Sequence, residues 1–145
     1  MADALRITPA TEADGEALAA LNRAFNEVEI SGPAQAARLR ETAAHERAFL
    51  AWVGDVAVGF TSLRFVPLVT TALPYGEVTE LYVQPAFRRR GIARALLAAA
   101  EARARALGAP GVILFTGLKN TDAQAFYRAV GYHDYAVTMR RVFGD

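Results

Sequence analysis

The chain has 145 residues, 53% of them hydrophobic and 21% charged, which predicts one packed domain over residues 1–145 and excludes a disordered chain. Its 16 basic and 15 acidic residues nearly cancel, and this balance argues against a nucleic-acid or membrane partner. The absence of cysteine excludes disulfides, thiolate metal sites and a cysteine nucleophile. Because the sequence has no membrane-spanning apolar run and its start lacks a signal-peptide core, we expect a soluble, cytoplasmic protein.

The N-terminal part of the chain predicts one strand and then two helices. Residues 5–7 suit a short strand. A helix over residues 11–25 follows, opened by the capping-box spacing of Thr11 and Asp14 and continued by apolar positions at helical spacing. A second helix is expected over residues 34–44, after a Gly-Pro break.

The middle of the chain changes to strand periodicity. Strands are expected over residues 48–53 and 56–66, joined into a hairpin by the turn at Gly54-Asp55. Residues 67–74 begin and end with proline and predict a loop, and a further strand is expected over residues 78–83.

The C-terminal part predicts two helices and three strands. In chain order they are a helix from Gly91 to residue 107, a buried strand over residues 112–115, a helix over residues 122–130, and closing strands over residues 132–135 and 136–143. The resulting order, β-α-α-β-β-β-α-β-α-β-β, describes an α/β mixture around one sheet.

The segment Leu81–Ala93 combines a strand end, the basic run Arg88–Arg90 and a helix that starts at the small residues Gly91 and Ala93. The first turn of a helix presents unpaired N–H groups and the positive end of its dipole, and small residues let a phosphate approach them. Arginines oppose the dipole at this place, so they indicate a bound anion; a solvated charge run is the alternative. The other common phosphate-loop motifs are absent from the sequence.

This segment resembles the cofactor loop of the GNAT superfamily of N-acetyltransferases, whose signature is Gln/Arg-x-x-Gly-x-Gly/Ala. Arg88, Gly91 and Ala93 match the signature in register, and Glu80–Pro85 looks like the family's fourth strand. The resemblance runs from Leu5 to Phe143. It implies an α/β fold with a mixed, mostly antiparallel sheet of about seven strands flanked by four helices.

The resemblance also implies a cofactor and its contacts. Acetyl-CoA would be the co-substrate, held mainly by backbone N–H groups of the loop, and no metal is expected. The residues expected to bind it are Leu81, Tyr82, Val83, Arg88, Arg89, Arg90, Gly91, Ile92, Ala93, Asn120 and Tyr127.

Residues 120–132 resemble a second family segment, Asn-x-x-Ala-x-x-Phe/Leu-Tyr-x-x-x-Gly-Phe/Tyr. A capping box of Thr121 and Gln124 would leave the Asn120 side chain free for a ligand amide; the alternative is that Asn120 itself caps the helix. Tyr127 reads from spacing as a core tyrosine, whereas the resemblance makes it the general acid that protonates the departing thiolate.

The resemblance implies direct attack of a neutral amine on the thioester in a ternary complex. N–H groups near Tyr82 and Val83 would polarise the carbonyl. Glu80 is the first choice for the base, directly or through a water, with Glu77 as the alternative; both could also be solvated edge charges. Strict alternation puts the carboxylates of Glu77 and Glu80 on opposite faces of the strand. A β-bulge between them would shift the alternation by one residue.

The acceptor is expected at residues 25–37 and 66–75, with Glu27, Glu29 and Tyr75 as candidates to hold a cationic amine. The sequence does not distinguish between polyamines, amino acids, aminoglycosides and protein N-termini as acceptors.

Two other functions are alternatives: a non-catalytic acyl-CoA sensor, and a nucleic-acid binder, which the balanced charge disfavours. A homodimer could use the apolar segment 136–143, and a monomer is the other alternative.

Overall fold

The computed structural model describes residues 3–144, and the chain divides into two compact units, one up to Leu114 and one from Phe115 onwards. Each unit is described by itself. The predicted single domain over residues 1–145 extends over both units and over residues that lie outside the described part, namely Met1, Ala2 and Asp145.

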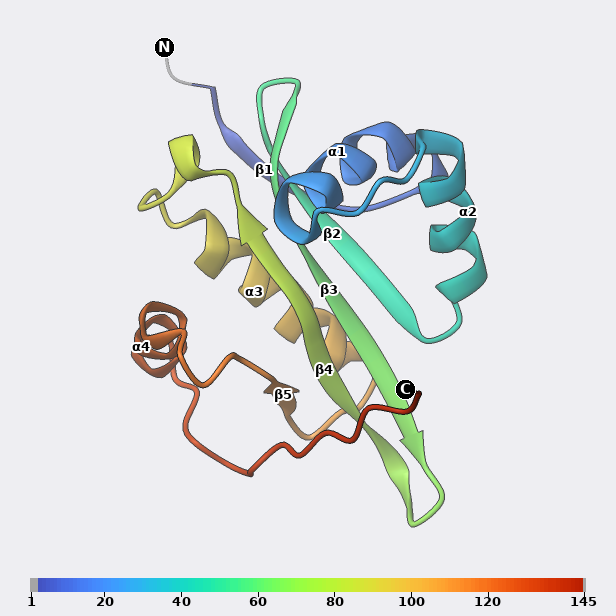
Figure 1. Ribbon diagram of the computed structural model, residues 1–145, viewed down its shortest axis with the longest axis vertical. Coiled ribbons are helices and arrows are strands. Elements are labelled where there is room, and N and C mark those ends of the chain that lie inside the picture. The colour runs from blue at the N-terminus through green and yellow to red at the C-terminus, as the bar shows by residue number, and fades with distance from the viewer. Residues whose placement is uncertain (1–2, 145) are drawn as a thin grey trace. The chain divides into compact units, whose positions relative to one another are not determined.

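The first unit is built on one five-stranded sheet (Figure 1). Its strands are β1 (Leu5–Pro9), β2 (Glu46–Val53), β3 (Val56–Leu68), β4 (Thr71–Val83) and β5 (Val112–Leu114). They lie in the order β1-β2-β3-β4-β5; the first three pairings are antiparallel and the pairing of β4 with β5 is parallel. The mixed, mostly antiparallel sheet expected from the resemblance is thereby confirmed.

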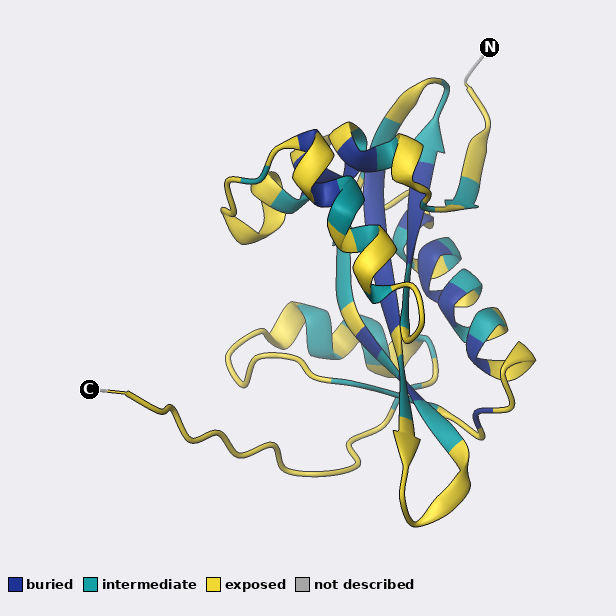
Figure 2. Ribbon diagram, turned by 90° about the vertical axis from the view of Figure 1, so that its right-hand side faces the viewer, coloured by how far each residue is buried: buried dark blue, intermediate teal, exposed yellow. Residues whose placement is uncertain are grey.

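Helices cover both faces of this sheet, as the edge-on view of Figure 2 shows. The helices α1 (Gly15–Asn26) and α2 (Gly32–Thr42) lie on one face, and α3 (Ile92–Ala106) lies on the other. The short 3-10 turns η1 (Glu12–Asp14) and η2 (Pro85–Phe87) precede α1 and α3.

Each face of the sheet carries its own core. Leu18 and Leu21 of α1 pack with Ala48, Leu50 and Phe60 of the sheet. On the opposite face, Ile92 and Leu96 of α3 pack with Phe49, Ala51, Val58 and Val83. Alternation along β2 and β3 therefore sends successive apolar side chains to the two helical layers.

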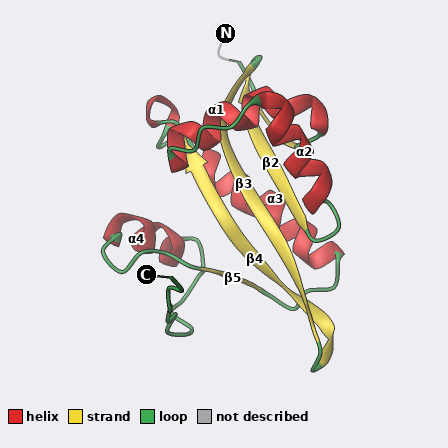
Figure 3. Cartoon of the chain, turned by 45° about the vertical axis from the view of Figure 1, so that its right-hand side comes forward, coloured by secondary structure: helices red, strands yellow, loops and turns green. Residues whose placement is uncertain are grey.

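The prediction of a loop over residues 67–74 is wrong, because β3 and β4 form a long hairpin with its turn at residues 69–70 (Figure 3). The strand register shifts between Val66 and Leu68, and Pro67 sits at this irregularity. Proline is tolerated in strands at such places, where no ladder hydrogen bond is required of its nitrogen.

The second unit contains α4 (Thr121–Ala129) and no strand within its described residues. The closing strands expected over residues 132–135 and 136–143 are therefore wrong, and the described part of the chain has five strands instead of about seven. The predicted number of four α-helices is confirmed for the same residues. None of those helices is long and apolar enough to cross a membrane.

Candidate functional site

The loop between β4 and α3 has the predicted order of strand, basic loop, small residue and helix. Arg89 and Gly91 both have left-handed backbone conformations, with φ of 64° and 78°. Gly91 is the N-cap of α3 and contributes no capping side chain, so the first N–H groups of the helix face outwards without a helical partner. A Cβ placed on Gly91 would meet no atom within 4 Å. The helix start is thus open to an anion.

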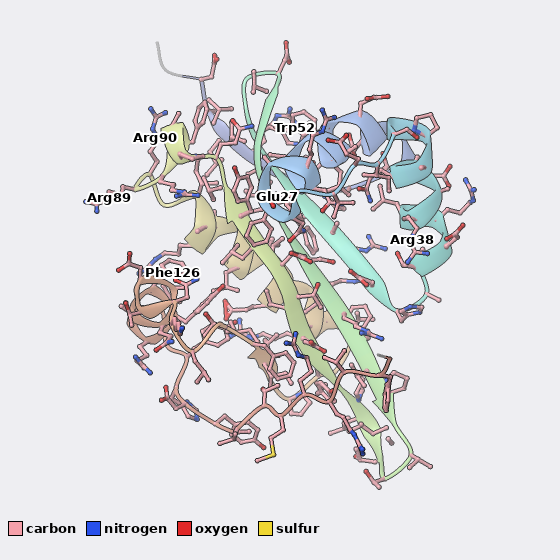
Figure 4. All side chains as sticks on the ribbon, viewed as in Figure 1. Glu27, Arg38, Trp52, Arg89, Arg90 and Phe126 are labelled. Atoms are coloured by element: carbon pink, nitrogen blue, oxygen red, sulfur yellow. The ribbon has the colours of Figure 1, made fainter. Side chains whose placement is uncertain are left out.

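The three arginines of the loop have different surroundings. The Nε of Arg88 donates a hydrogen bond of 3.0 Å to the Val83 carbonyl, and its guanidinium lies 5.9 Å from the centre of the Tyr82 ring. The guanidinium of Arg90 lies 5.1 Å from the Phe87 ring centre. Arg89 and Arg90 project outwards from the loop in Figure 4. Arg88 therefore fastens the loop to β4, while the other two add positive charge at the helix start.

The expected cofactor residues on β4 and at the start of α3 turn their side chains into the core. Val83 and Ile92 are buried against the α3 layer, and Leu81 and Ala93 pack partly against it. Their backbone groups, and not their side chains, are the parts that a cofactor could contact.

Strand β4 has an open edge beyond its short pairing with β5. The two strands pair only from Gly76 to Val78, and no other strand of the described residues pairs with that edge of residues 79–83. The N–H of Gln84 donates to Val58 of β3 at 2.8 Å, so antiparallel alternation turns the N–H groups of Val83 and Leu81 to the open edge. The N–H of Tyr82, by the same count, faces β3.

A β-bulge interrupts β4 at Thr79. Ser62 of β3 pairs with Glu80, but the next residue, Leu63, pairs with Val78, which leaves Thr79 as the extra residue. The expected bulge in this strand is confirmed.

The bulge brings both candidate bases to one face. Glu77, Glu80 and Tyr82 pair with Arg64, Ser62 and Phe60, which are alternate residues of β3 and therefore share a face. Phe60 packs with α1, so this is the α1 face of the sheet. The opposite orientation expected from strict alternation of Glu77 and Glu80 is wrong, because the extra residue resets the alternation between them.

Glu80 is half-buried between this face and the end of α1. Burial raises the pKa of its carboxyl, a hydrogen bond of 3.4 Å from the Asn26 amide lowers that pKa, and the nearby Glu46 carboxylate raises it. Glu46 itself accepts a 2.7 Å hydrogen bond from the Ser62 hydroxyl. A carboxylate with a raised pKa is a stronger base than an ordinary glutamate.

An aromatic cluster lies beside Glu80. The ring of Phe25 stacks on Tyr82 with their centres 5.0 Å apart, and its edge meets Phe60 at 6.1 Å. Phe25 remains 41% exposed. The α1 face therefore offers an apolar wall next to a carboxylate, which suits an amine carried on an organic body.

The other expected acceptor residues have local structural roles. Glu27 ends α1 in a left-handed conformation with φ of 58°, Glu29 lies 3.9 Å from Arg23, and Tyr75 pairs with Val66 in the hairpin. Their contact with an acceptor stays a prediction.

In the second unit, Asn120 is the N-cap of α4, and its Oδ1 accepts a 3.2 Å hydrogen bond from the Ala123 N–H. The Gln124 amide donates to the carbonyls of Gly117 and Leu118, at 2.8 and 3.1 Å. The capping box of Thr121 and Gln124 is therefore wrong, and the alternative cap is correct. Contact of Asn120 with CoA stays a prediction.

Tyr127 lies on α4 between two aromatic rings. The centres of the Phe126 and Tyr132 rings are 5.4 and 5.9 Å from its own. Burial raises the pKa of the Tyr127 hydroxyl. The phenol is consequently protonated at neutral pH and can donate a proton.

The sequence did not single out Asn22, Asn26 or Gln35, whose amides connect to Glu80. The only local signal is that two asparagines stand at i and i+4 in one helix, although asparagine has a low helix propensity. Among the residues from 3 to 144, no group of three or more His, Asp or Glu side chains is arranged to hold a metal ion.

Comparison with known proteins identifies the family. A family model for acetyltransferases, the GNAT family, matches residues 16–132, which include both the loop and the Asn120 segment. The chain belongs to the GNAT acetyltransferase family. It is thus a member of a family of acyltransferases, as the resemblance implied.

Two GNAT relatives are similar in sequence. The aminoalkylphosphonate N-acetyltransferase of Salmonella typhimurium is 39% identical over 97 residues, which are 67% of this chain and 62% of that protein. The IAA acetyltransferase of Azospirillum brasilense is 42% identical over 60 residues, 41% of this chain and 39% of that protein. The matched part of the chain spans less than two thirds of the length of either relative.

Solved GNAT structures share the fold. An aminoglycoside N-acetyltransferase in complex with CoA superposes with a TM-score of 0.82 at 24% identity, covering 99% of this chain and 95% of that one. A ribosomal-protein-alanine N-acetyltransferase from Brucella melitensis gives a TM-score of 0.80 at 22% identity, with 96% and 99% covered.

Proposed function

We propose that this protein transfers an acetyl group from acetyl-CoA to a primary amine of a small molecule, by direct attack in a ternary complex. The observation that carries the proposal is the open start of α3, where Gly91 leaves space for an anion directly after the open edge of β4. We include in the proposal a single domain over residues 1–145, a cytoplasmic location and a homodimer.

The donor site uses backbone groups first. The N–H groups from Gly91 to Arg94 suit the CoA pyrophosphate, and Arg89 and Arg90 add charge. The pantetheine arm of CoA carries amides, which match the outward N–H and C=O groups of Leu81. Acetyl-CoA supplies the activated acyl group as a thioester.

The protein's own groups then move protons. Glu80 accepts a proton from the acceptor ammonium, directly or through a water, and so frees the amine lone pair. The amine nitrogen bonds to the thioester carbon, the carbon–sulfur bond breaks, and the Val83 N–H stabilises the negative charge that develops on the carbonyl oxygen. Tyr127 donates its proton to the departing thiolate, and the proton that the acylated nitrogen must lose returns through water to the Tyr127 phenolate. The roles of Asn120 and Tyr127 follow from the family segment.

The acceptor side favours a cationic small molecule. Glu46, Glu77 and Glu80 share the α1 face of the sheet with Arg64 of β3 and Arg6 of β1. The carboxylates outnumber these two arginines, so an ammonium group there gains favourable charge interactions. The relative from Salmonella typhimurium is named for an aminoalkylphosphonate, and the CoA complex is of an aminoglycoside N-acetyltransferase. The aminoalkylphosphonate relative, at 39% identity, supports a small amine over a protein amine.

The test is release of CoA thiol from acetyl-CoA with a panel of amines, amino acids and peptides. We expect turnover with a cationic small amine. Tyr127→Phe and Glu80→Gln should each lower kcat by about 100-fold, while acetyl-CoA still binds, because general acid or base catalysis contributes at least this much. Glu41→Gln, an exposed change on α2, is the control and should keep full activity.

Three results contradict parts of the proposal. CoA binding without turnover by any amine would identify an acyl-CoA sensor. Turnover of peptides alone would move the acceptor to proteins. Full activity of Tyr127→Phe would remove its assignment as the acid.

A further inference from the structure

A line of side-chain amides connects α2 through α1 to Glu80. The Nδ2 of Asn26 donates to Glu80 Oε2 at 3.4 Å and also to Asn22 Oδ1 at 2.9 Å. The Nδ2 of Asn22 in turn donates to Gln35 Oε1 at 3.1 Å. Gln35 is a buried side chain of α2, only 8% exposed. Three hydrogen bonds therefore connect a buried anchor with the carboxylate.

The order of donors and acceptors fixes how each amide is turned. An asparagine amide that rotates by half a turn exchanges its NH₂ for its oxygen, and an oxygen facing a carboxylate is repelled. Asn22 Oδ1 holds the NH₂ of Asn26 in place for Glu80. Gln35 Oε1 holds Asn22 in the orientation that presents this oxygen. Asn26 is thus prepared as a donor before any substrate binds.

Close contact of the two helices holds this line in register. A Cβ on Gly15 of α1 would collide with the Gly32 carbonyl oxygen of α2, and a Cβ on Gly32 would collide with the Glu16 side chain of α1. The two glycines therefore allow the helices to approach closely at this crossing. Asn22 and Asn26 are four residues apart and share one side of α1. The crossing therefore places that side of α1 between Gln35 and β4.

We propose that Gln35, Asn22 and Asn26 form an amide relay that positions the Glu80 carboxylate for proton transfer from the acceptor amine. Asn26 and Asn22 are its positioning residues, and Gln35 is its anchor. The inference rests on the proposed function, in which Glu80 is the base.

The relay lowers the pKa of the Glu80 carboxyl, whereas the other influences on this group raise it. Burial and the Glu46 carboxylate of β2 raise the Glu80 pKa, and the Asn26 N–H lowers it by stabilising the ionised form. The further charged groups on this face are Arg6 of β1, Arg64 of β3 and Glu77 of β4. Arg88 lies against the Tyr82 ring, and the last turn of α1 adds Arg23 with Glu27 next to it. Without the relay the carboxylate takes up a proton at a higher pH, and the base is lost over a wider acidic range.

The experiment measures kcat/KM against pH for Asn26→Ala, Asn22→Ala and Gln35→Leu, with acetyl-CoA and the amine that turns over best. We expect the acidic limb of Asn26→Ala to move upwards by about half to one pH unit, the worth of one hydrogen bond to a charged group. Activity should fall about three- to tenfold below the limb and recover above it. The other two variants should move the limb the same way by less.

Two further variants separate positioning from structure. Asn26→Gln keeps an amide donor and should restore part of the acidic activity. Thr42→Ala removes an exposed hydroxyl that bonds within α2, to the Arg38 carbonyl, and should leave the limb unchanged. An equal loss of activity at every pH in Asn26→Ala would overturn the relay.

A readout without turnover keeps the relay distinct from the base assignment. The Glu80 carboxyl carbon can be titrated by NMR, with Glu80→Gln identifying its resonance. A higher midpoint in Asn26→Ala supports the relay even if Glu80→Gln retains activity, in which case only the base assignment fails. An unchanged midpoint overturns the relay whatever the activity.

Discussion

Two glycines with similar positive φ angles flank α3. Gly91 before the helix has φ of 78° and Gly108 after it has φ of 84°, and a Cβ on either would meet no atom within 4 Å. Both positions therefore resist other residues because of backbone conformation and not because of crowding. Only Gly91 lies at the proposed phosphate site.

Alanine at either glycine tests this difference. Gly91→Ala and Gly108→Ala should each cost about 1–2 kcal/mol in the free energy of unfolding, because the left-handed conformation disfavours a Cβ. Gly91→Ala alone should also weaken CoA binding, about tenfold by isothermal titration calorimetry, a loss of about 1.4 kcal/mol. Equal CoA affinity in the two variants would remove the helix start from the donor site.

Sequence reasoning succeeded at residues whose role follows from local pattern. The order of the loop was predictable because the loop lies within a few residues of chain, whereas the left-handed conformations of Arg89 and Gly91 were not predicted. The common face of Glu77 and Glu80 was not predicted, since it depends on one extra residue in the pairing with β3. The amide relay was missed because its hydrogen bonds join three separate elements.

At the scale of elements, the crossing of α1 and α2 has the least tolerance for added atoms. Gly15 and Gly32 are both buried there. The Gly15 position should be crowded by a single methyl group, because the backbone carbonyl opposite belongs to the first residue of α2. The packing of these two helices then determines where Gln35 lies.

Gly15→Ala should destabilise the protein by about 1–3 kcal/mol, as overpacking does, and lower the melting temperature seen by circular dichroism. Gly111→Ala is the matched control, since its Cβ would meet no atom within 4 Å and its φ lies outside the left-handed region. That variant should melt like the unchanged protein. Similar melting of both variants would show that the two helices separate easily.

Element prediction failed where pairing partners decide the structure. The polar and apolar mixture of residues 67–74 predicts a loop, yet the segment pairs as a hairpin that accommodates Pro67 and Pro74 where its register is irregular. The sequence predicts closing strands over residues 132–135 and 136–143, but a segment forms a strand only when another strand pairs with it. The helical spacing of Ile92, Leu96, Ala99 and Ala100 predicts one apolar face of α3, and these residues are buried or partly buried in the structure.

At the scale of the whole molecule, the C-terminal segment exposes an unusual amount of apolar surface. Tyr135, Val137 and Met139 stand at alternate positions with 82%, 82% and 88% of their surface exposed, and Phe143 is similarly open. An alternating apolar row of this kind is buried efficiently when the segment pairs as a strand. We therefore assign the proposed homodimer contact to residues 136–143.

Light scattering of the full chain tests this contact. The unchanged protein should have twice the mass of the chain at high concentration, and Val137→Glu combined with Met139→Glu should reduce it to a monomer, because a strand pairing would bury both charges. Thr138→Glu alternates to the other side of the segment and is the control. A monomeric mass for the unchanged protein at all concentrations would rule out the dimer.

The bulge at Thr79 also bears on how this protein can change over time. Deleting that one residue would leave Glu77 and Glu80 two positions apart, so simple alternation would still place both on the α1 face with the same partners on β3. A single-codon deletion at the bulge can therefore be accommodated without moving either carboxylate to the other side of the sheet. When β4 is aligned between relatives, the position of this extra residue decides which acidic residue is equivalent to Glu80.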